Sequence, residues 1–296
     1  MRRFGFDKVI NNEGVMTKKP GYEFLDCGNR RKLERFGEVV TDRPCPQAAW
    51  APGLPEAAWQ EAGAVFHRRS GGGSAWEFKT DAPADDWSVA FGDIVLGLRP
   101  AGNGQVGVFA EQLVNWRWIQ DTVAHADREI SVLNTFAYTG AASLFAAAAG
   151  ASVCHVDAAK ASVTQARLNA ELSGLADRPL RLIVDDMVTF MEKELRRGRT
   201  YDGIILDPPA FGRSKSGKTW SLIRQLPQLL DLTARLMSRK PLFLLLSCHD
   251  PEINRVQLTK MLRGLIPAGN LETGELVLES AHGVSLPAGI YARGLA

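Results

Sequence analysis

The chain has 296 residues, of which 45% are hydrophobic and 23% are charged, and its formal net charge is +2. This is the composition of a globular protein with one large or two medium domains, and no apolar run approaches the roughly 18 residues that a membrane span needs. The small net charge neither requires nor excludes a nucleic-acid partner, and the four widely spaced cysteines lack a CxxC pair, so neither a zinc site nor a disulfide framework is predicted.

Residues 1–110 are predicted to form a small β-rich domain that begins with a loose polar arm over 1–20. A strand from Tyr22, a turn at 27–29 and a second strand ending at Val40 are expected, followed by a proline-rich stretch too broken for long elements. One further hairpin is expected across the GGGS turn. Another is expected across Gly-Asn-Gly at 102–104, next to a stretch of alternating apolar residues.

Basic residues and tryptophans are interspersed in this β-rich region. Together they suit contact with phosphates and stacking on the bases of RNA. The alternative for each is that the tryptophan belongs to the core and the basic residue to a solvated face. The residues concerned are Arg30, Arg31, Lys32, Arg35, His67, Arg68 and Arg69, with Trp50, Trp59, Trp76 and Trp87.

Beyond residue 110 helices alternate with strands, which predicts a parallel, doubly wound α/β sheet. A last pair of strands without an intervening helix predicts an antiparallel hairpin at one edge. Helices are expected at 111–126, 141–149, 158–172, 188–196, 221–238 and 252–265. Strands are expected up to 133 and at 152–156, 180–184, 201–206, 241–247, 275–279 and 289–295.

The stretch from Val132 to Asp157 resembles half of a nucleotide-binding strand–helix–strand unit. Gly140 stands in the turn before an alanine-rich helix, and Asp157 ends the next strand, where an acid can accept both ribose hydroxyls. The full G-x-G-x-x-G fingerprint is absent, which argues against a dinucleotide pyrophosphate. S-adenosylmethionine, with ribose and adenine but no pyrophosphate, fits better. The alternative is an ordinary unit of this kind without a ligand.

Acids recur at successive strand ends, at Asp157, in the pair at 185–186 and at Asp207. The carboxyl ends of strands are where ligands bind in open α/β sheets. Asp186 is expected to accept the exocyclic amine of adenine, with Met187 lying against the purine. The alternative for each acid is a helix N-cap.

Asp207 opens the turn Asp-Pro-Pro-Ala-Phe, the most specific signal in the chain. Pro208 and Pro209 remove backbone donors and stiffen the turn, leaving carbonyl acceptors, a carboxylate and the ring of Phe211. Such a set can hold a planar, amine-bearing ring such as a nucleobase. The following loop, with Arg213, Lys215 and Lys218, is expected to be mobile and to suit phosphates.

Cys248 ends the next apolar strand, followed by His249. A thiolate that adds to carbon 6 of cytosine turns the ring into an enamine that accepts a methyl group at carbon 5, so Cys248 is predicted as a nucleophile. His249 or nearby cations are expected to lower the pKa of the thiol. The alternative is an inert, buried cysteine.

With these residues in place the chain resembles the class I S-adenosylmethionine-dependent methyltransferases, and more narrowly the 23S ribosomal RNA cytosine-C5 methyltransferases of the large-subunit methyltransferase I type. The resemblance covers 105–296 and implies a Rossmann-like, seven-stranded, doubly wound sheet in a catalytic domain over 111–296. The matching segments are GVFAEQ, LNTFAYTG, VDAAKASVTQARLNAEL, VDDMVTF, YDGIILDPPAF, LLLSC and LPAGIYARG.

The resemblance also implies roles for single residues. Cys248 would be the attacking thiol, with Asp207 as its partner at the base, and Gln112 would lie near the site. The implied cofactor contacts are Phe136, Tyr138, Gly140, Asp157, Asp186 and Asp207. The chain departs from the family in having Ala210 where the family has lysine, in its GRSKSGK insertion, and in lacking sequence that matches the family's N-terminal PUA-type RNA-binding domain.

The first interpretation is therefore a methyltransferase with S-adenosylmethionine as cofactor, acting on ribosomal RNA at cytosine C5. An N-methyltransferase for a base or protein amine is the second, and an RNA-binding module without catalysis is the third. Because the thiols are unpaired and no signal peptide is seen, we expect a cytoplasmic protein with no membrane partner. The sequence leaves the oligomeric state open, with a homodimer as one option.

Overall fold

The computed structural model describes residues 9–10, 16–17, 21–68, 73–79, 87–213, 219–266 and 270–295. The chain divides into two compact units. Unit 1 comprises Met1–Ala110 with Val277–Leu286, and unit 2 comprises Glu111–Leu276 with Pro287–Ala296. Residues 277–286, which the sequence assigned to the catalytic domain, thus group with the N-terminal region.

Unit 2 is built on a seven-stranded sheet, in agreement with the predicted Rossmann-like α/β fold. The first five strands of this sheet are parallel and the sixth runs antiparallel to its inner neighbour, which confirms that the sheet ends in a pair without a crossover helix. Across the sheet the order is β12 (Leu180–Val184), β11 (Ser152–Asp157), β10 (Ser131–Thr135), β13 (Gly203–Leu206), β16 (Phe243–Cys248), β18 (Ser285–Leu295) and β17 (Leu271–Glu279).

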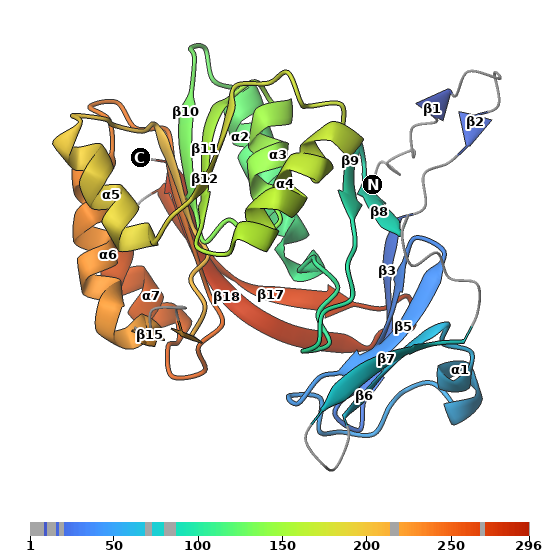
Figure 1. The fold of residues 1–296 in the computed structure, drawn as a ribbon. Coiled ribbons are helices and arrows are strands. Elements are labelled where there is room, and N and C mark those ends of the chain that lie inside the picture. Colours follow the sequence, from blue (N-terminus) through green and yellow to red (C-terminus); the bar gives the residue numbers. More distant parts are fainter. Residues whose placement is uncertain are drawn as a thin grey trace. The chain divides into compact units, whose positions relative to one another are not determined.

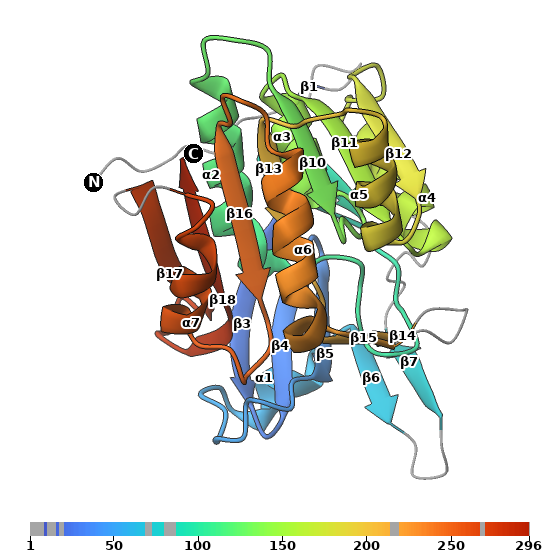
Figure 2. The ribbon, with the colours of Figure 1, turned by 90° about the vertical axis from the view of Figure 1, so that its left-hand side faces the viewer.

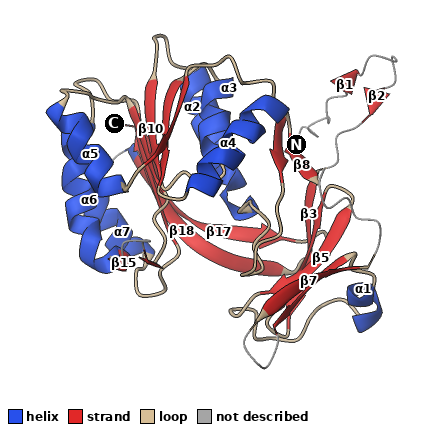
Figure 3. Ribbon diagram, in the orientation of Figure 1, coloured by secondary structure: helices blue, strands red, loops and turns tan. Residues whose placement is uncertain are grey.

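The central strands are apolar on both faces because helices cover both faces (Figures 1 and 3). In β16, Leu244 and Leu246 enter one buried cluster while Leu245 enters the other, as the strand period of two requires. One face packs on α5 (Met187–Arg196), α6 (Leu222–Leu236) and α7 (Arg255–Leu262), which Figure 2 shows from their own side. The opposite face of the sheet is covered by α2 (Leu113–Ala124), α3 (Ala141–Ala148) and α4 (Lys160–Leu172). The 3-10 turn η1 (Ala110–Gln112) directly precedes α2.

The strand order reverses beside β10. From β10 the chain passes through β11 to β12 on one side and then crosses to β13 and β16 on the other. Ligands of open α/β sheets bind at the carboxyl ends of the strands next to such a reversal. The fold therefore directs attention to the turns that follow β10 and β13.

Unit 1 contains a five-stranded sheet and a separate two-stranded hairpin. The predicted strand ending at Val40 is instead two strands, because Gly37 (φ 65°) turns the chain between them. The chain turns back across 102–104 as expected, with the Arg99 N–H donating to the Val106 carbonyl at 2.9 Å and the Ala101 N–H to the Gln105 carbonyl at 2.8 Å. A further turn at Gly92 (φ 67°), which was not predicted, joins the strands of the two-stranded hairpin. The strands are β3 (Tyr22–Gly28), β4 (Arg31–Phe36), β5 (Val39–Pro44), β6 (Ala64–Arg68), β7 (Ser74–Phe78), β8 (Ser88–Phe91) and β9 (Ile94–Gly97), with helix α1 (Glu56–Gln60) and the short pair β1 (Val9–Ile10) and β2 (Met16–Thr17).

Within the described ranges, no helix is both long enough and apolar enough to cross a bilayer.

Candidate active site

The residues singled out in the sequence lie along one edge of the unit 2 sheet. Strands β11, β10, β13 and β16 are parallel neighbours, so their carboxyl ends share this edge. The edge carries the turn at 136–140, Asp157, Asp207 and Cys248, each at the end of or just after its own strand. The topology therefore gathers side chains that are more than 100 positions apart in the sequence.

The turn after β10 holds two non-glycine residues in the left-handed region, Phe136 (φ 54°) and Tyr138 (φ 49°). Such conformations are sparsely populated and cluster at ligand sites. Gly140 (φ 96°) completes the turn, and a Cβ there would lie 3.0 Å from the Cβ of Ala166. The sequence identified Gly140 by its residue type, whereas no residue type signals a left-handed phenylalanine or tyrosine.

Asp157 holds this turn through hydrogen bonds with the backbone. Its Oδ2 accepts from the Tyr138 N–H at 2.9 Å and its Oδ1 accepts from the Ala159 N–H at 2.8 Å. Burial raises the pKa of Asp157, and the two backbone donors partly offset this. Each carboxylate oxygen has a further lone pair, so the group can also accept ribose hydroxyls, the role predicted for it.

Asp186 and Met187 occupy the start of α5. Asp186 is exposed and caps the helix, its Oδ1 accepting from the Thr189 N–H at 3.0 Å. Met187 is buried, and its Sδ accepts from the Phe136 N–H at 3.2 Å. The structure thus displays the capping role for Asp186, places Met187 against the strained turn, and leaves the adenine contacts of both as a prediction.

The Asp-Pro-Pro turn presents an unusually exposed aromatic ring. Phe211 is 69% exposed, whereas Pro208 is buried. The carbonyl of Pro209 accepts from Trp220 Nε1 at 2.7 Å, so this expected acceptor is already used within the protein. Trp220 also packs on Phe136, with 4.9 Å between the ring centroids.

The predicted basic loop is only partly described. Its flanks form a two-stranded antiparallel ribbon, β14 (Phe211–Arg213) and β15 (Thr219–Ser221), where an irregular loop was expected. Lys215 and Lys218 lie outside the described residues, and for Arg213 only the backbone is described. Their contact with phosphates remains a prediction.

Asp207 receives two hydrogen bonds on the same oxygen. Gln112 Nε2 donates to Asp207 Oδ1 at 3.0 Å, and His249 Nε2 lies 3.3 Å from that atom. Asn115 Nδ2 in turn donates to Gln112 Oε1 at 2.8 Å. Gln112, predicted near the site as a cofactor-binding residue, therefore contacts the predicted catalytic acid directly, and its contact with the cofactor stays a prediction.

Both ring nitrogens of His249 face acceptors. Nε2 faces Asp207, and Nδ1 lies 2.8 Å from the carbonyl oxygen of Ala288. Burial alone would lower the pKa of His249, but the hydrogen bond to Asp207 and the charges of Asp207 and Glu111 outweigh it and raise the pKa to about 9. Gly289 makes room for the ring, because a Cβ there would lie 2.7 Å from Nδ1.

Cys248 lies at the end of β16, and its residue is only 1% exposed. Burial raises the pKa of its thiol, and the charges of Asp250 and Asp207 add to this shift. The expectation that His249 lowers this pKa is therefore wrong, because His249 pairs with Asp207 and does not face the thiol as a free cation. The nucleophilic role itself stays a prediction.

Two residues of this edge, Trp220 and Asn115, were not predicted from the sequence, and His249 was predicted to act on the thiol and not on Asp207. Trp220 bridges the proline turn and Phe136, His249 forms the ion pair with Asp207, and Asn115 orients Gln112. The spacing of Gln112 and Asn115, three residues apart at the start of a helix, was the one available signal, since such residues are neighbours on the helix surface.

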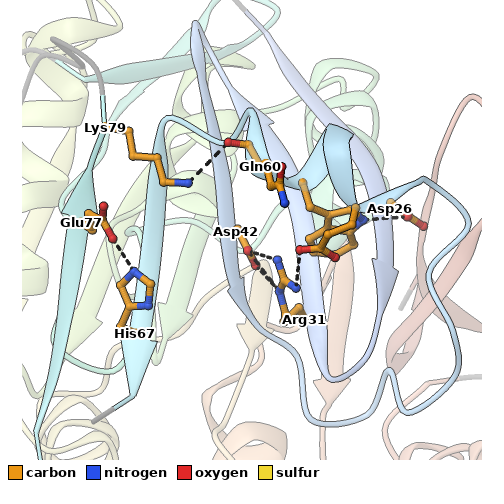
Figure 4. Close-up of polar contacts among 9 residues, drawn as sticks. Asp26, Arg31, Asp42, Gln60, His67, Glu77 and Lys79 are labelled. Atoms are coloured by element: carbon orange, nitrogen blue, oxygen red, sulfur yellow. Dashed lines mark hydrogen bonds and ion pairs between the residues drawn. The ribbon is translucent and has the colours of Figure 1, made fainter.

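Several cations of unit 1 pair with acids of the same five-stranded sheet. Arg31 contacts Asp42, and His67 contacts Glu77 at 2.7 Å (Figure 4). Arg31 also lies over the Trp59 ring. Lys32 and Arg35 likewise pair with Glu34 and Glu23, and Arg69 lies outside the described residues.

The tryptophans of unit 1 differ in exposure. Trp59 and Trp87 are buried, so these two tryptophans belong to the core and are not available to stack on a base. Trp50 is 42% exposed and Trp76 is half-buried. These two rings are the tryptophans of the region that remain accessible to a stacking base.

Comparisons with known proteins place this edge in a chemical context. The model of the S-adenosylmethionine-dependent methyltransferase family matches residues 24–255. A crystal structure of a SAM-dependent methyltransferase from Agrobacterium tumefaciens is 37% identical, with a TM-score of 0.86 over 93% of this chain and 90% of that one.

Curated relatives match over shorter stretches. The ribosomal RNA large subunit methyltransferase I of Aeromonas salmonicida is 28% identical over 174 residues, which are 55% of this chain and 42% of that protein. The protein of the same name from Photobacterium profundum is 40% identical over 86 residues, 29% of this chain and 22% of that protein. The match thus spans less than half the length of these two relatives.

The family match covers most of the chain. The chain belongs to the S-adenosylmethionine-dependent methyltransferases, enzymes that use S-adenosylmethionine as methyl donor.

Proposed function

We propose that this enzyme methylates a base in RNA, with ribosomal RNA as its substrate class. The observation that carries the proposal is the Asp-Pro-Pro turn, where the exposed ring of Phe211 follows a carboxylate with one oxygen already saturated by Gln112 and His249. An aromatic face recognises an unstacked base, and a carboxylate oxygen accepts from its amine. The curated relatives are named as ribosomal RNA methyltransferases, which supports a ribosomal RNA substrate.

We assign the cofactor to the strained turn. Asp157 would accept the ribose hydroxyls, Asp186 and Met187 would contact adenine, and Phe136, Tyr138 and Gly140 would line the turn. When bound, S-adenosylmethionine supplies an electrophilic methyl group. Asp207 lies just beyond β13, the direct neighbour of β10, so an acceptor held by Asp207 would lie next to this turn.

We further propose cytosine C5 as the methylated atom and Cys248 as the nucleophile. Register supports this, because Leu206 pairs with Leu246, which brings Asp207 alongside Ser247, the residue before Cys248. Addition of Sγ to C6 would make C5 nucleophilic, and elimination of the thiol after methylation and loss of the C5 proton would restore the ring. The raised pKa of Cys248 means that the thiol must lose its proton during base binding.

One observation favours a second candidate, methylation of an amine on a base or a protein. Cys248 is 1% exposed and its pKa is raised, as for an inert structural thiol. In this case the Asp207 carboxylate would hold the amine and no covalent intermediate would form.

The acceptor class is tested by incubating the enzyme with methyl-labelled S-adenosylmethionine and total RNA from a strain lacking the gene. We expect label that RNase releases and protease does not. Label that only protease releases, or label only in small molecules, would exclude RNA as the substrate.

Cys248→Ala separates the two chemistries, with Cys154→Ala as a matched control because Cys154 is a buried strand cysteine on β11 of the same sheet. We expect Cys248→Ala to lose RNA methylation by a factor of about 10³ or more while binding S-adenosylmethionine normally. Retained methylation in Cys248→Ala would establish the amine reaction and a structural thiol.

The four cysteines are all buried and unpaired, which supports the proposal that the enzyme works in the reducing cytoplasm. Its role there would be in ribosomal RNA processing.

A further inference from the structure

We propose that Asn115 and Arg293 are positioning residues, which lock the Gln112 amide so that it donates to Asp207 Oδ1 and leaves Oδ2 for the acceptor base. The inference rests on the proposed function in one respect, the assignment of Asp207 to the acceptor. All the residues that carry it belong to unit 2.

Arg293 stands at one end of this series of hydrogen bonds and can only donate. Arg293 NH1 donates to Asn115 Oδ1 at 3.1 Å. Its guanidinium is held by Glu272, through Nε at 3.2 Å and NH2 at 2.9 Å, and lies 4.5 Å from the Tyr291 ring and 5.0 Å from the Trp118 ring. Because a guanidinium has no acceptor, the Asn115 atom that faces it must be the carbonyl oxygen.

The other end can only accept, since an ionised Asp207 carboxylate has no hydrogen to donate. Between the two ends, Asn115 Nδ2 donates to Gln112 Oε1 at 2.8 Å and Gln112 Nε2 donates to Asp207 Oδ1 at 3.0 Å. Turning either amide over would place two donors or two acceptors against each other. The direction of both amides is therefore set by Arg293 and Asp207 together.

Burial makes this direction costly to reverse. Asn115 is 1%, Gln112 4% and Arg293 6% exposed, so water has little access to rescue a mismatched pair. On Asp207, both Gln112 and His249 converge on Oδ1. Within the described part of the chain no residue donates to Oδ2, which is the oxygen left for a base.

The decisive variant is Asn115→Asp, which keeps the shape and the contact with Arg293 but offers Gln112 a carboxylate instead of an amide N–H. Gln112 must then turn its N–H groups to the new carboxylate and its carbonyl to Asp207. We expect kcat/KM for RNA methylation to fall about 10- to 100-fold, the cost of one hydrogen bond to a charged group. Affinity for S-adenosylmethionine is expected to stay unchanged.

The pKa of the His249 imidazole, measured by NMR, distinguishes a reversed Gln112 amide from a loosened site. This measurement needs no substrate. The charged groups that act on His249 are Asp207, after β13, and Glu111, in η1. A reversed Gln112 brings its carbonyl to His249 Nε2, which the amide nitrogen now faces at 3.4 Å, so the pKa should stay at about 9 or rise. A loosened site would lose the Asp207 contact, and the pKa would fall toward its ordinary value of 6.5.

Two controls complete the design. Asn254→Asp makes the same chemical change at an exposed N-cap of α7, where aspartate also caps, and should leave activity unchanged. Arg293→Lys retains a group that can only donate, so this variant should keep most of its activity. Arg293→Met has no donor at this position and should lose most of its activity.

The outcomes separate the inference from the proposed function. Wild-type activity in Asn115→Asp, or equal activity in the two Arg293 variants, would overturn the positioning role. A fall of the His249 pKa in Asn115→Asp would overturn it as well. If wild-type enzyme labels no RNA, the proposed function fails, while the titration of His249 still decides the amide orientation.

Discussion

At the scale of single residues, Asp207 and His249 form an ion pair at the edge of the sheet that carries the candidate site. Because the pKa of His249 is raised to about 9, its ring keeps both protons at neutral pH, and Gln112 and His249 leave one oxygen of Asp207 available. The sequence placed both residues at strand ends but assigned His249 to the thiol, because linear proximity to Cys248 was the only visible cue.

The pair predicts a specific pH dependence of stability. The folded pKa of His249, about 9, lies above its ordinary value of 6.5, so the folded protein holds this proton more tightly than the unfolded chain. The contribution is fully present below pH 6.5 and is lost as the pH rises through 9. We therefore expect wild type to have a higher free energy of unfolding than His249→Asn at about pH 6, as measured in urea. This difference should shrink as the pH rises to about 9.5. An excess independent of pH would contradict the ion pair.

The thiols give a second prediction at this scale. All four cysteines are buried, and burial raises the pKa of the Cys27, Cys45, Cys154 and Cys248 thiols. Native enzyme should therefore react slowly with Ellman's reagent at about pH 7.5, and unfolded enzyme should react at four thiols. A rapidly reacting thiol in native enzyme that Cys248→Ala removes would show that Cys248 is more accessible than its burial indicates.

At the scale of elements, the turn after β10 depends on Gly140. In Gly140→Ala the new Cβ is strained by the left-handed backbone and also lies against the Cβ of Ala166. In Gly150→Ala only the backbone strain arises, because nothing lies within 4 Å of a Cβ at that position. We expect Gly150→Ala to cost about 1–2 kcal/mol of stability and Gly140→Ala more. Only Gly140→Ala should weaken S-adenosylmethionine binding, as measured by calorimetry. Equal effects of the two variants on binding would exclude a role for the turn.

The elements themselves were largely predictable where apolar runs alternate with helical stretches. The strand at 180–184 is observed with its predicted bounds, and the helices of unit 2 differ by a few residues at their ends. The hairpins of unit 1 were harder, because the turns at Gly37 and Gly92 are marked by a single glycine each, and only the strand pairing shows that these glycines end a strand. At the site, strand-end acids are visible in sequence, whereas the partners Trp220 and Asn115 depend on how separate elements meet.

At the scale of the whole molecule, residues 277–286 of the C-terminal strand pair belong to unit 1. Leu278 and Leu286 are buried, and this segment groups with unit 1 although its strands continue into unit 2. A fragment of residues 111–296 should therefore expose both leucines, bind a hydrophobic dye and aggregate. The same fragment carrying Leu278→Ser and Leu286→Ser should be more soluble. A monomeric, dye-free fragment without these changes would contradict the grouping.

We propose that this methyltransferase modifies a cytosine in RNA at the edge that carries Asp207 and Cys248. The most direct measurement is the identity of the nucleoside labelled in RNA by wild-type enzyme and methyl-labelled S-adenosylmethionine, after complete digestion and chromatography. The account predicts that the label runs with 5-methylcytidine. Label on an exocyclic amine or a ring nitrogen would contradict it and would make Cys248 a structural residue.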